Sequence, residues 1–353
     1  MKRMAEYQRL DEVCHINMGQ SPDSKSYNQE GVGLPFFQGN ADFGAMYPET
    51  RVWCSSPTKI VEAGTLLISV RAPIGALNFA KERSCIGRGL AGITPQNGVS
   101  LKYIYYCLKG KNKELNAKGT GSTFKAIAKS ALGETSVKIV SEEDQLKIIQ
   151  TLDRVSSVIE AIKQQLTELD NLIKARFVEL FYDKGYPVLK WNDVFNTTTG
   201  KLDSNAAVDS GEYPFFTCSK EVLKIDKYAF EQEALLLAGN NAAGKYDVKY
   251  YNGKFNAYQR TYVLGLKEDW SYRLFQYQLE DKLVYLQQQS LGGLTKYLTL
   301  KILGELEFII PPKDKQEEFE LFVKQTDKSK VVVQKALDEA QTLFDSLMQE
   351  YFG

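Results

Sequence analysis

Amide and basic side chains stand in turn-rich segments at roughly matching places in the two halves of this sequence. Asn and Gln can pair with adenine and Arg with guanine in the major groove, while Lys reaches phosphates. Taken singly, each of these residues is explained equally well by an ordinary solvated loop. Their recurrence in both halves favours a DNA-binding surface. The candidate residues are Gln38, Asn40, Arg71, Asn78, Arg88, Lys125, Lys129, Ser219, Lys220, Asn240, Asn241, Lys245, Gln259, Arg260 and Lys296.

Residue patterns typical of catalysis are missing from the sequence. The single histidine, His15, has no accompanying metal-ligand cluster and no motif of a nucleophilic triad. No GxxxxGK[ST] segment occurs, and the glycines of Gly87–Gly92 lack a clear strand-loop-helix setting. Pro311-Pro312 lies between Ile310 and Lys313, which is not the tetrapeptide of an amino-methyltransferase. We therefore predict no catalytic residue, no metal ligand and no cofactor in this chain.

The composition predicts a protein of the cytoplasm without a membrane segment. No stretch approaches 18 uninterrupted apolar residues, and the first residues lack the apolar run of a signal peptide. The cysteines are odd in number and show no CxxC spacing, so we expect reduced thiols rather than disulfides. They are Cys14, Cys54, Cys85, Cys107 and Cys218.

The net charge is zero, but it is unevenly distributed. Residues 1–140 hold 18 Lys and Arg against 11 Asp and Glu, whereas residues 183–312 hold 15 against 16. A basic first part is compatible with binding to a phosphate backbone. The second part lacks that signature, so charge alone gives weak support for nucleic acid.

The chain repeats itself at an interval of about 171 residues. Gly119–Gln145 aligns with Ser290–Gln316, and Leu132-Gly133 aligns with Leu303-Gly304 within it. A duplicated chain presents two similar surfaces, which suits a target in two parts such as duplex DNA.

Each copy begins with a mixed α/β lobe. In the first we expect strands at 66–70 and 136–140 and a short helix at 101–108. In the second, Tyr213–Phe216 echoes Leu34–Phe37, and we expect one helix over 272–286 to replace the short one.

Each copy ends in a long helical pattern with a heptad-like apolar seam. Ser141 is the expected N-cap of the first helix. Thr326 and Lys330 interrupt the second seam, where we expect looser packing or a polar gap. The seam residues are Ile148, Leu152, Val155, Ile159, Ile162, Leu166, Leu169, Ile173, Phe319, Val323, Val333, Leu337 and Phe344.

Two such helices most simply form an antiparallel coiled coil, each roughly 60 Å long at ~1.5 Å per residue, with the lobes at opposite ends. The alternative is that each helix packs on its own lobe. The predicted fold class is α+β, with two pseudo-symmetric α/β domains separated by two long helices. The predicted domains are residues 1–140, 141–182, 183–312 and 313–353.

Several segments together resemble the specificity subunits of type I restriction-modification systems. The resemblance rests on GTLLISVRAPIG (Gly64–Gly75), GSTFKAIAKSALG (Gly121–Gly133), the helix start at Gln145 and LDNLIKARFVELF (Leu169–Phe181). The lobe–helix–lobe–helix order covers essentially the whole chain. The second lobe departs from the pattern, because Leu235–Gly244 lacks the Ile-Ser and the Arg of the first copy.

The resemblance implies a non-catalytic subunit of a bacterial or archaeal cytoplasm. Each lobe would be a target-recognition domain that reads one half of a split sequence in double-stranded DNA. The helices would set the gap between the half-sites and dock two methyltransferase subunits, and restriction-translocase subunits would join them. S-adenosylmethionine, ATP and Mg would belong to those partner subunits.

Two other functions stay open on the residues alone. The first is a scaffold, an orphan subunit with a helical rod and two lobes but no DNA readout, which the neutral charge favours slightly. The second is a stand-alone DNA enzyme, which every missing motif disfavours.

Overall fold

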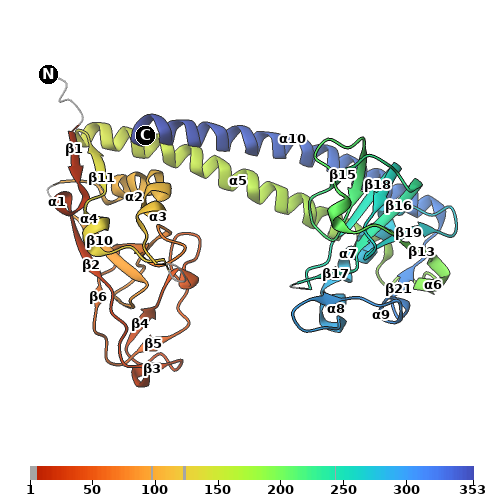
Figure 1. Cartoon of the computed structure of the whole chain (residues 1–353), viewed down its shortest axis with the longest axis horizontal. Coiled ribbons are helices and arrows are strands. Elements are labelled where there is room, and N and C mark those ends of the chain that lie inside the picture. Colours follow the sequence, from red (N-terminus) through yellow and green to blue (C-terminus); the bar gives the residue numbers. More distant parts are fainter. Residues whose placement is uncertain (1–5, 97, 122–124, 243) are drawn as a thin grey trace. The chain divides into compact units, whose positions relative to one another are not determined.

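The computed structural model describes residues 6–96, 98–121, 125–242 and 244–353. Two compact units divide the chain: residues 1–163 with 335–353, and residues 164–334. The expected motif at Gly121–Gly133 falls partly outside the described residues, because residues 122–124 are not among them. Each unit combines mixed sheets with helices (Figure 1), as the predicted α+β class requires.

The described strands of the first unit form three sheets. Strands β1 (Glu6–Arg9) and β11 (Ser136–Ile139) form a pair, and β2 (Cys14–Met18), β10 (Leu90–Pro95), β7 (Leu66–Ser69) and β8 (Leu77–Phe79) form a four-stranded sheet in that order. The third sheet has the order β3 (Tyr27–Asn28), β5 (Trp53–Cys54), β4 (Leu34–Phe37), β9 (Ser84–Ile86) and β6 (Ile60–Val61).

Short helices complete the first unit. They are α1 (Leu10–Val13), α2 (Leu101–Gly110), α3 (Asn112–Lys118) and α4 (Lys129–Gly133), with 3-10 turns η1 (Ser24–Ser26) and η2 (Asn40–Asp42). The buried side chains of α2, such as Tyr103, Ile104 and Leu108, share one core with Leu66 and Ile68 of β7. That core fixes the sheet edges from which the polar loops project.

The second unit fuses two sheets that are separate in the first. Its six-stranded sheet has the order β13 (Phe195–Thr199), β19 (Thr261–Leu266), β16 (Phe230–Ala238), β18 (Val248–Ala257), β14 (Tyr213–Phe216) and β15 (Leu223–Ile225). The fusion arises because β18 is one continuous strand of ten residues. Its first and last residues lie 171 positions after the start of β8 and the end of β9, so it corresponds to both strands of the first copy.

The remaining elements of the second unit follow the first closely. Two further strand pairs are β12 (Val188–Lys190) with β21 (Glu307–Ile309) and β17 (Asn240–Asn241) with β20 (Lys296–Tyr297). The helices are α6 (Trp191–Val194), α7 (Tyr272–Asp281), α8 (Leu283–Gln289) and α9 (Leu300–Gly304), with the 3-10 turn η3 (Ser204–Ala206).

The 171-residue interval is exact from the short helices onward. α7 matches α2 and α8 matches α3 at both ends, as α9 matches α4. The expected single helix over residues 272–286 is therefore wrong: the chain breaks at Lys282 just as it breaks at Lys111 in the first copy. Near the start of each copy the interval is longer: β2 begins at Cys14 and β13 at Phe195, which are 181 residues apart.

The two long helices have the expected extent. α5 runs from Glu142 to Phe181 and α10 from Lys313 to Phe352, both with 40 residues. The Ser141 hydroxyl accepts a hydrogen bond from the Asp144 N–H at 3.2 Å, as an N-cap does.

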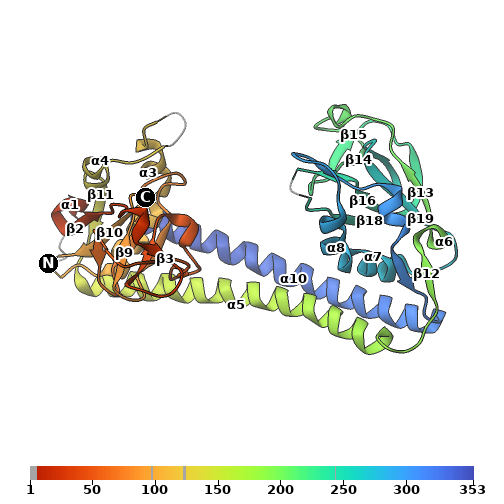
Figure 2. The ribbon, with the colours of Figure 1, turned by 90° about the horizontal axis from the view of Figure 1, so that it is seen from below.

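In each unit the local segments of α5 and α10 pack on each other and on the lobe (Figure 2). In the second unit the pairing is antiparallel, because Asp170 meets Lys330 while Arg176 meets Glu318. Every predicted seam residue is buried or half-buried. The helices therefore form an antiparallel seam and also pack on the lobes, so both expected arrangements contribute.

The polar interruption of the second seam is filled rather than loose. Thr326 is buried, and its hydroxyl donates to the Phe322 carbonyl at 3.0 Å. The Lys330 ammonium lies 2.5 Å from an Asp170 carboxylate oxygen across the helix pair. A matched ion pair thus occupies the position that Ile159 holds in the first copy.

Candidate nucleic-acid interface

Three candidate residues of the first unit, Gln38, Asn40 and Arg88, follow the carboxyl ends of two parallel strands. β4 and β9 run parallel, with Phe36 opposite Cys85 and Phe37 opposite Ile86. The chain beyond them stays in contact, because Gly87 N–H donates to the Phe37 carbonyl at 2.8 Å. Gln38 and Arg88 are therefore neighbours, and both are exposed.

The glycines on either side of Arg88 allow this close approach. A Cβ at Gly87 would come within 2.6 Å of the Gln38 side-chain oxygen, and one at Gly89 within 2.3 Å of the Gln38 carbonyl oxygen. Gly89 N–H donates to that same carbonyl at 3.1 Å. The glycine-rich segment thus has a backbone-packing role that presents Arg88 to solvent.

Ser21, which was not among the predicted residues, contacts two of these candidates. The Gln38 side-chain amide donates to the Ser21 hydroxyl at 2.9 Å, and the Arg88 N–H donates to it at 3.4 Å. Asn40 lies close by, at the start of η2. The available signal in the sequence was the turn at Gln20–Asp23, whose last residue precedes η1 as Asp203 precedes η3 in the second copy.

Two more candidates continue the same surface. Val70 N–H donates to the Gly89 carbonyl, and Ala72 N–H donates to the Lys125 carbonyl, both at 2.9 Å. These bonds place the exposed Arg71 and Lys125 beside the loop of Arg88. The first unit therefore gathers two arginines, a lysine and two amides, which we define as surface 1: Gln38, Asn40, Arg71, Arg88 and Lys125.

Two predicted residues of the first unit lie elsewhere. Asn78 is only 2% exposed, and its amide donates to the Gly44 and Leu77 carbonyls, each at 3.0 Å. Its burial within the sheet removes it from surface 1. Lys129, at the start of α4, lies near Asp11 of α1 and contributes to holding the pKa of that carboxyl below its usual range, after the larger effect of Arg9.

The second unit repeats the backbone frame of the first. Tyr258 N–H donates to the Phe216 carbonyl at 2.9 Å, and Gly239 N–H donates to the Arg260 carbonyl at 2.8 Å. Asn240 pairs with Tyr297 and Asn241 with Lys296, where the first unit pairs Arg71 with Ala126.

This frame brings together most of the remaining candidates. Gln259 and Arg260 are exposed in the place of Arg88 and Gly89, and Lys245 follows β17. Ser219 and Lys220 are exposed after β14, and the Ser219 carbonyl accepts a hydrogen bond from the Lys249 ammonium at 2.8 Å. We define surface 2 as Ser219, Lys220, Asn240, Asn241, Lys245, Gln259, Arg260 and Lys296.

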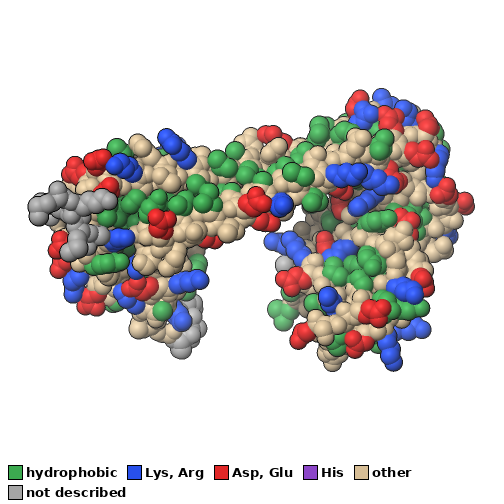
Figure 3. Space-filling view, turned by 90° about the horizontal axis from the view of Figure 1, so that it is seen from above, with side chains coloured by type: hydrophobic (Ala, Val, Ile, Leu, Met, Phe, Trp, Pro, Cys, Tyr) green, Lys and Arg blue, Asp and Glu red, His purple; other side chains and the backbone are tan. Residues whose placement is uncertain are grey.

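Acidic groups are closer to surface 2 than the sequence suggested. The Gln259 amide donates to an Asp203 carboxylate oxygen at 3.2 Å, and Lys249 also pairs with Asp247. On the face shown in Figure 3, Lys and Arg side chains of this unit (right) are interspersed with Asp and Glu. Surface 2 thus carries four basic side chains and three amides, and one of those amides is bound to a carboxylate.

A pair of contacts that occurs in both copies connects each long helix to its lobe. The Ser100 N–H donates to the Gln145 side-chain oxygen at 2.9 Å, and the Gln145 amide donates to the Val140 carbonyl at 3.0 Å. In the second unit Ser271, Gln316 and Pro311 make the same bonds at 2.9 and 2.8 Å. The repeated glutamine therefore fixes the start of each long helix.

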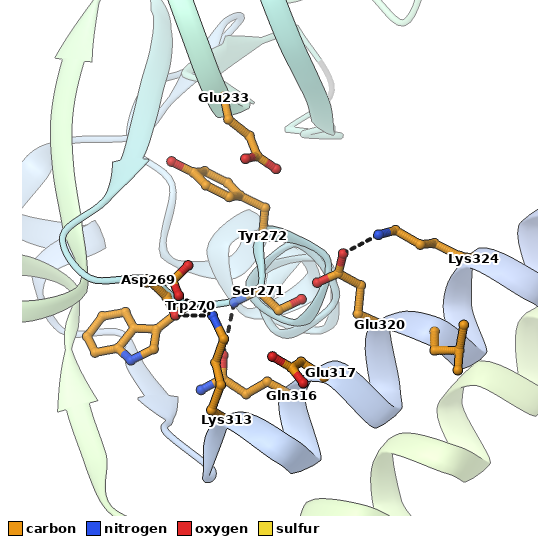
Figure 4. Close-up of a pocket in the computed structure, with 11 residues that line it drawn as sticks. Glu233, Asp269, Trp270, Ser271, Tyr272, Lys313, Gln316, Glu317, Glu320 and Lys324 are labelled. Carbon is orange, nitrogen blue, oxygen red and sulfur yellow. Dashed lines mark hydrogen bonds and ion pairs between the residues drawn. The ribbon is translucent and has the colours of Figure 1, made fainter.

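A cavity of about 390 Å³ lies beside Gln316 where α10 begins (Figure 4). Four of its lining residues are acidic: Glu233, Asp269, Glu317 and Glu320. Its two lysines are engaged, since Lys313 pairs with Asp269 at 2.6 Å and Lys324 with Glu320 at 2.5 Å. Such a lining disfavours an anionic cofactor.

The titratable groups that sequence reasoning weighed show no catalytic arrangement. His15 is exposed on β2, and burial raises the pKa of the neighbouring Cys14 thiol to about 12. Burial also raises the pKa of Cys107, so both thiols stay protonated near neutral pH. All five cysteines are free, four of them buried.

Neither a metal-ligand cluster nor a membrane-spanning helix occurs in the described part of the chain. Across residues 6–96, 98–121, 125–242 and 244–353, no group of three His, Cys, Asp or Glu side chains could hold a metal ion. Over the same ranges, no helix is long and apolar enough to cross a membrane.

The fold and the surfaces together define a class of protein: a duplicated α+β chain in which each copy has one loop surface and one long helix. The sequence model of the type I restriction modification DNA specificity domain matches residues 4–171 and again residues 184–339. The chain belongs to this family.

Individual relatives agree with this assignment. A Methanocaldococcus jannaschii protein provisionally named the type I restriction enzyme MjaX specificity subunit is 39% identical over 160 residues, 45% of this chain and 38% of that protein. The Escherichia coli type I restriction enzyme EcoDI specificity subunit is 35% identical over 134 residues, 37% of this chain and 29% of that protein. The chain thus matches less than two fifths of the length of either relative.

A solved structure shares the fold along nearly the whole chain. The type I restriction-modification S subunit from M. genitalium superimposes with a TM-score of 0.62 at 17% identity. The match covers 99% of this chain and 96% of that one. This likeness supports the fold in both copies, including the long helices.

Proposed function

We propose that this chain is the DNA-specificity subunit of a type I restriction-modification complex and reads a bipartite site in double-stranded DNA. The observation that carries the proposal is the repeated backbone frame with different side chains on it. Surface 1 offers Arg71 and Arg88 where surface 2 offers Asn240 and Gln259. Arg prefers guanine and amides prefer adenine, so one frame can read two different half-sites.

The proposal assigns no chemistry to this chain. Methyl transfer and cleavage would be performed by two methyltransferase subunits and by restriction-translocase subunits, which would hold S-adenosylmethionine, ATP and Mg. The four acidic residues that line the cavity at Gln316 disfavour an anionic cofactor there. Such a complex would work in a bacterial or archaeal cytoplasm.

The test is reconstitution of the chain with its methyltransferase subunits. Methylation of randomised duplexes followed by sequencing should reveal one split sequence with a fixed gap. Methylation without preference for any split sequence would contradict the proposal. The isolated chain, incubated with S-adenosylmethionine and DNA, should show no turnover, and turnover would instead support a stand-alone enzyme.

A scaffold without DNA readout is the second candidate, and the near-neutral charge of the second unit favours it. The two functions separate at surface 1. Loss of site choice in Arg71→Ala and Arg88→Ala, with partner binding retained, supports DNA readout. Unchanged site choice in both variants supports the scaffold.

A further inference from the structure

The second unit exposes an apolar side chain at the tip of the loop between α8 and β20. Leu294 is 96% exposed, although it lies only two residues from Lys296 of surface 2. Among the exposed large hydrophobic side chains of the described residues it has the highest exposure, ahead of Val331 at 70%. Neither the fold nor the contacts of surface 2 explain it.

Backbone hydrogen bonds give the loop a defined turn conformation. Leu291 and Tyr297 exchange two backbone hydrogen bonds, of 3.1 and 2.9 Å, that close its base. Gly292 has a φ of +101°, and a Cβ there would lie 2.2 Å from the Thr295 carbonyl oxygen. Gly293 has no neighbouring atom within 4 Å of a Cβ position. The turn therefore holds Leu294 out from the protein in a defined position.

Surface 2 borders the base of this turn directly. Asn241 pairs with Lys296 in the short β17–β20 sheet. A Cβ on Gly244, one residue before Lys245, would lie 3.4 Å from Cγ of Lys296 and 3.3 Å from Cγ of Gln287 on α8. The turn, the amides and the lysines thus belong to one continuous part of the second unit.

The chemistry around Leu294 suits a nucleic acid. Residues 282–301 contain three lysines and no Asp or Glu, with a run of glutamines at Gln287–Gln289. Val284 and Tyr285 on α8 are 66% and 46% exposed. At the 171-residue interval the first copy has Lys113 and Glu114 there, so charge is replaced by apolar surface in the second copy.

We propose that Leu294 is an apolar wedge that inserts between base pairs of the duplex bound by the second unit. Leucine is among the side chains that unstack a base step and so let a bent duplex contact more protein. Such a wedge would add affinity that does not depend on charge, and residues 183–312 have no excess of Lys and Arg over Asp and Glu. The inference rests on the proposed DNA-reading function.

The experiment uses the reconstituted complex with its methyltransferase subunits and its cognate duplex. 2-Aminopurine replaces adenine at successive positions of each half-site, because its fluorescence rises when it is unstacked. We expect an increase in one half-site with the wild-type complex. Leu294→Ser should abolish that increase and weaken binding about tenfold, as the loss of an apolar contact of this size predicts.

Two further variants control the result. Leu294→Met keeps a long apolar side chain and should retain most of the fluorescence increase. Val188→Ser removes a 52% exposed apolar side chain from β12 of the same unit and should change neither readout. Subunit stoichiometry, measured by light scattering, should be unchanged in all three.

The outcomes separate this inference from the proposed function. A site-selective complex whose fluorescence and affinity are indifferent to Leu294→Ser would overturn the wedge alone. Loss of methyltransferase binding in Leu294→Ser would also overturn it, since the loop would then be a protein-docking surface. A wild-type complex without site preference would overturn both.

Discussion

At the scale of single residues, position in the backbone frame decides which of the candidate residues share a surface. Arg71 and Arg88 belong to one exposed surface because Val70 and Gly89 are hydrogen-bonded. Asn78, of an equally suitable type, is buried in the sheet. A polar residue next to a turn is therefore a good candidate only when the strand order places it with others.

The clearest residue-level prediction concerns the arginines of surface 1. Arg88→Ala in the reconstituted complex should reduce discrimination at one base pair by about tenfold, since a bidentate base contact contributes about 1–3 kcal/mol. Methylation rates on duplexes with single substitutions measure the effect.

The matched control for Arg88→Ala is Arg83→Ala. Arg83 is similarly exposed in the same unit but pairs with Glu62 at 3.2 Å. Equal loss of discrimination in both variants would indicate a general charge effect and contradict base readout by Arg88.

At the scale of elements, the two copies resemble each other more closely in the long helices and their attachment than in the sheets of the lobes. α5 and α10 begin and end at exactly equivalent residues, and each carries one glutamine that binds the preceding strand and the start of a short helix. The sheets differ, because one long β18 replaces β8 and β9. The lobe can change its surface while its attachment to the helix stays constant.

The glutamine contacts predict a stability effect. Gln145→Ala leaves the Ser100 N–H and the Val140 carbonyl without this partner, which should lower the free energy of unfolding by about 1–3 kcal/mol. Gln316→Ala should do the same in the second unit. Urea unfolding measures both, and Gln150→Ala, an exposed change on α5, is the control.

The ion pair in the second seam predicts an effect of opposite sign. Lys330→Ile restores the residue type that Ile159 provides at the equivalent position, and should raise the free energy of unfolding by about 1 kcal/mol. The lost Lys330–Asp170 pair contributes less than that, because Asp170 is 61% exposed and surface pairs are weak. A decrease of stability in Lys330→Ile would show that the pair matters more than burial.

At the scale of the whole molecule, duplication with divergence is the central property of the chain. The family match falls twice, on residues 4–171 and 184–339, and the same loop frame recurs in each. Under the proposed function, the helices would determine how far apart the two half-sites lie.

Lengthening both helices tests that role. Four residues inserted after Ala161 of α5 and four after Glu339 of α10 should add about one turn, ~6 Å, to each helix. The preferred gap should then grow by one or two base pairs, because duplex DNA rises ~3.4 Å per pair. An unchanged gap in methylation sequencing would contradict the role of the helices as spacers.

Sequence alone determined the repeat, the extent of the long helices and the residues of their seam. These depend on local periodicity and on an N-cap at Ser141, which neighbouring residues specify. It also placed the strands near residues 66 and 136 and the short helix at 101. It failed at residues 272–286, where the break at Lys282 is visible only by comparison with Lys111.

Tertiary structure decided which polar residues form a surface. Parallel pairing of β4 with β9 brings Gln38 to Arg88, which are 50 residues apart in sequence, and no local pattern encodes that pairing. The same packing buries Asn78, sets Lys129 beside Asp11 and leaves Leu294 exposed. Periodicity fixes which side of a helix is apolar, but only the pairing of distant strands fixes which loops meet.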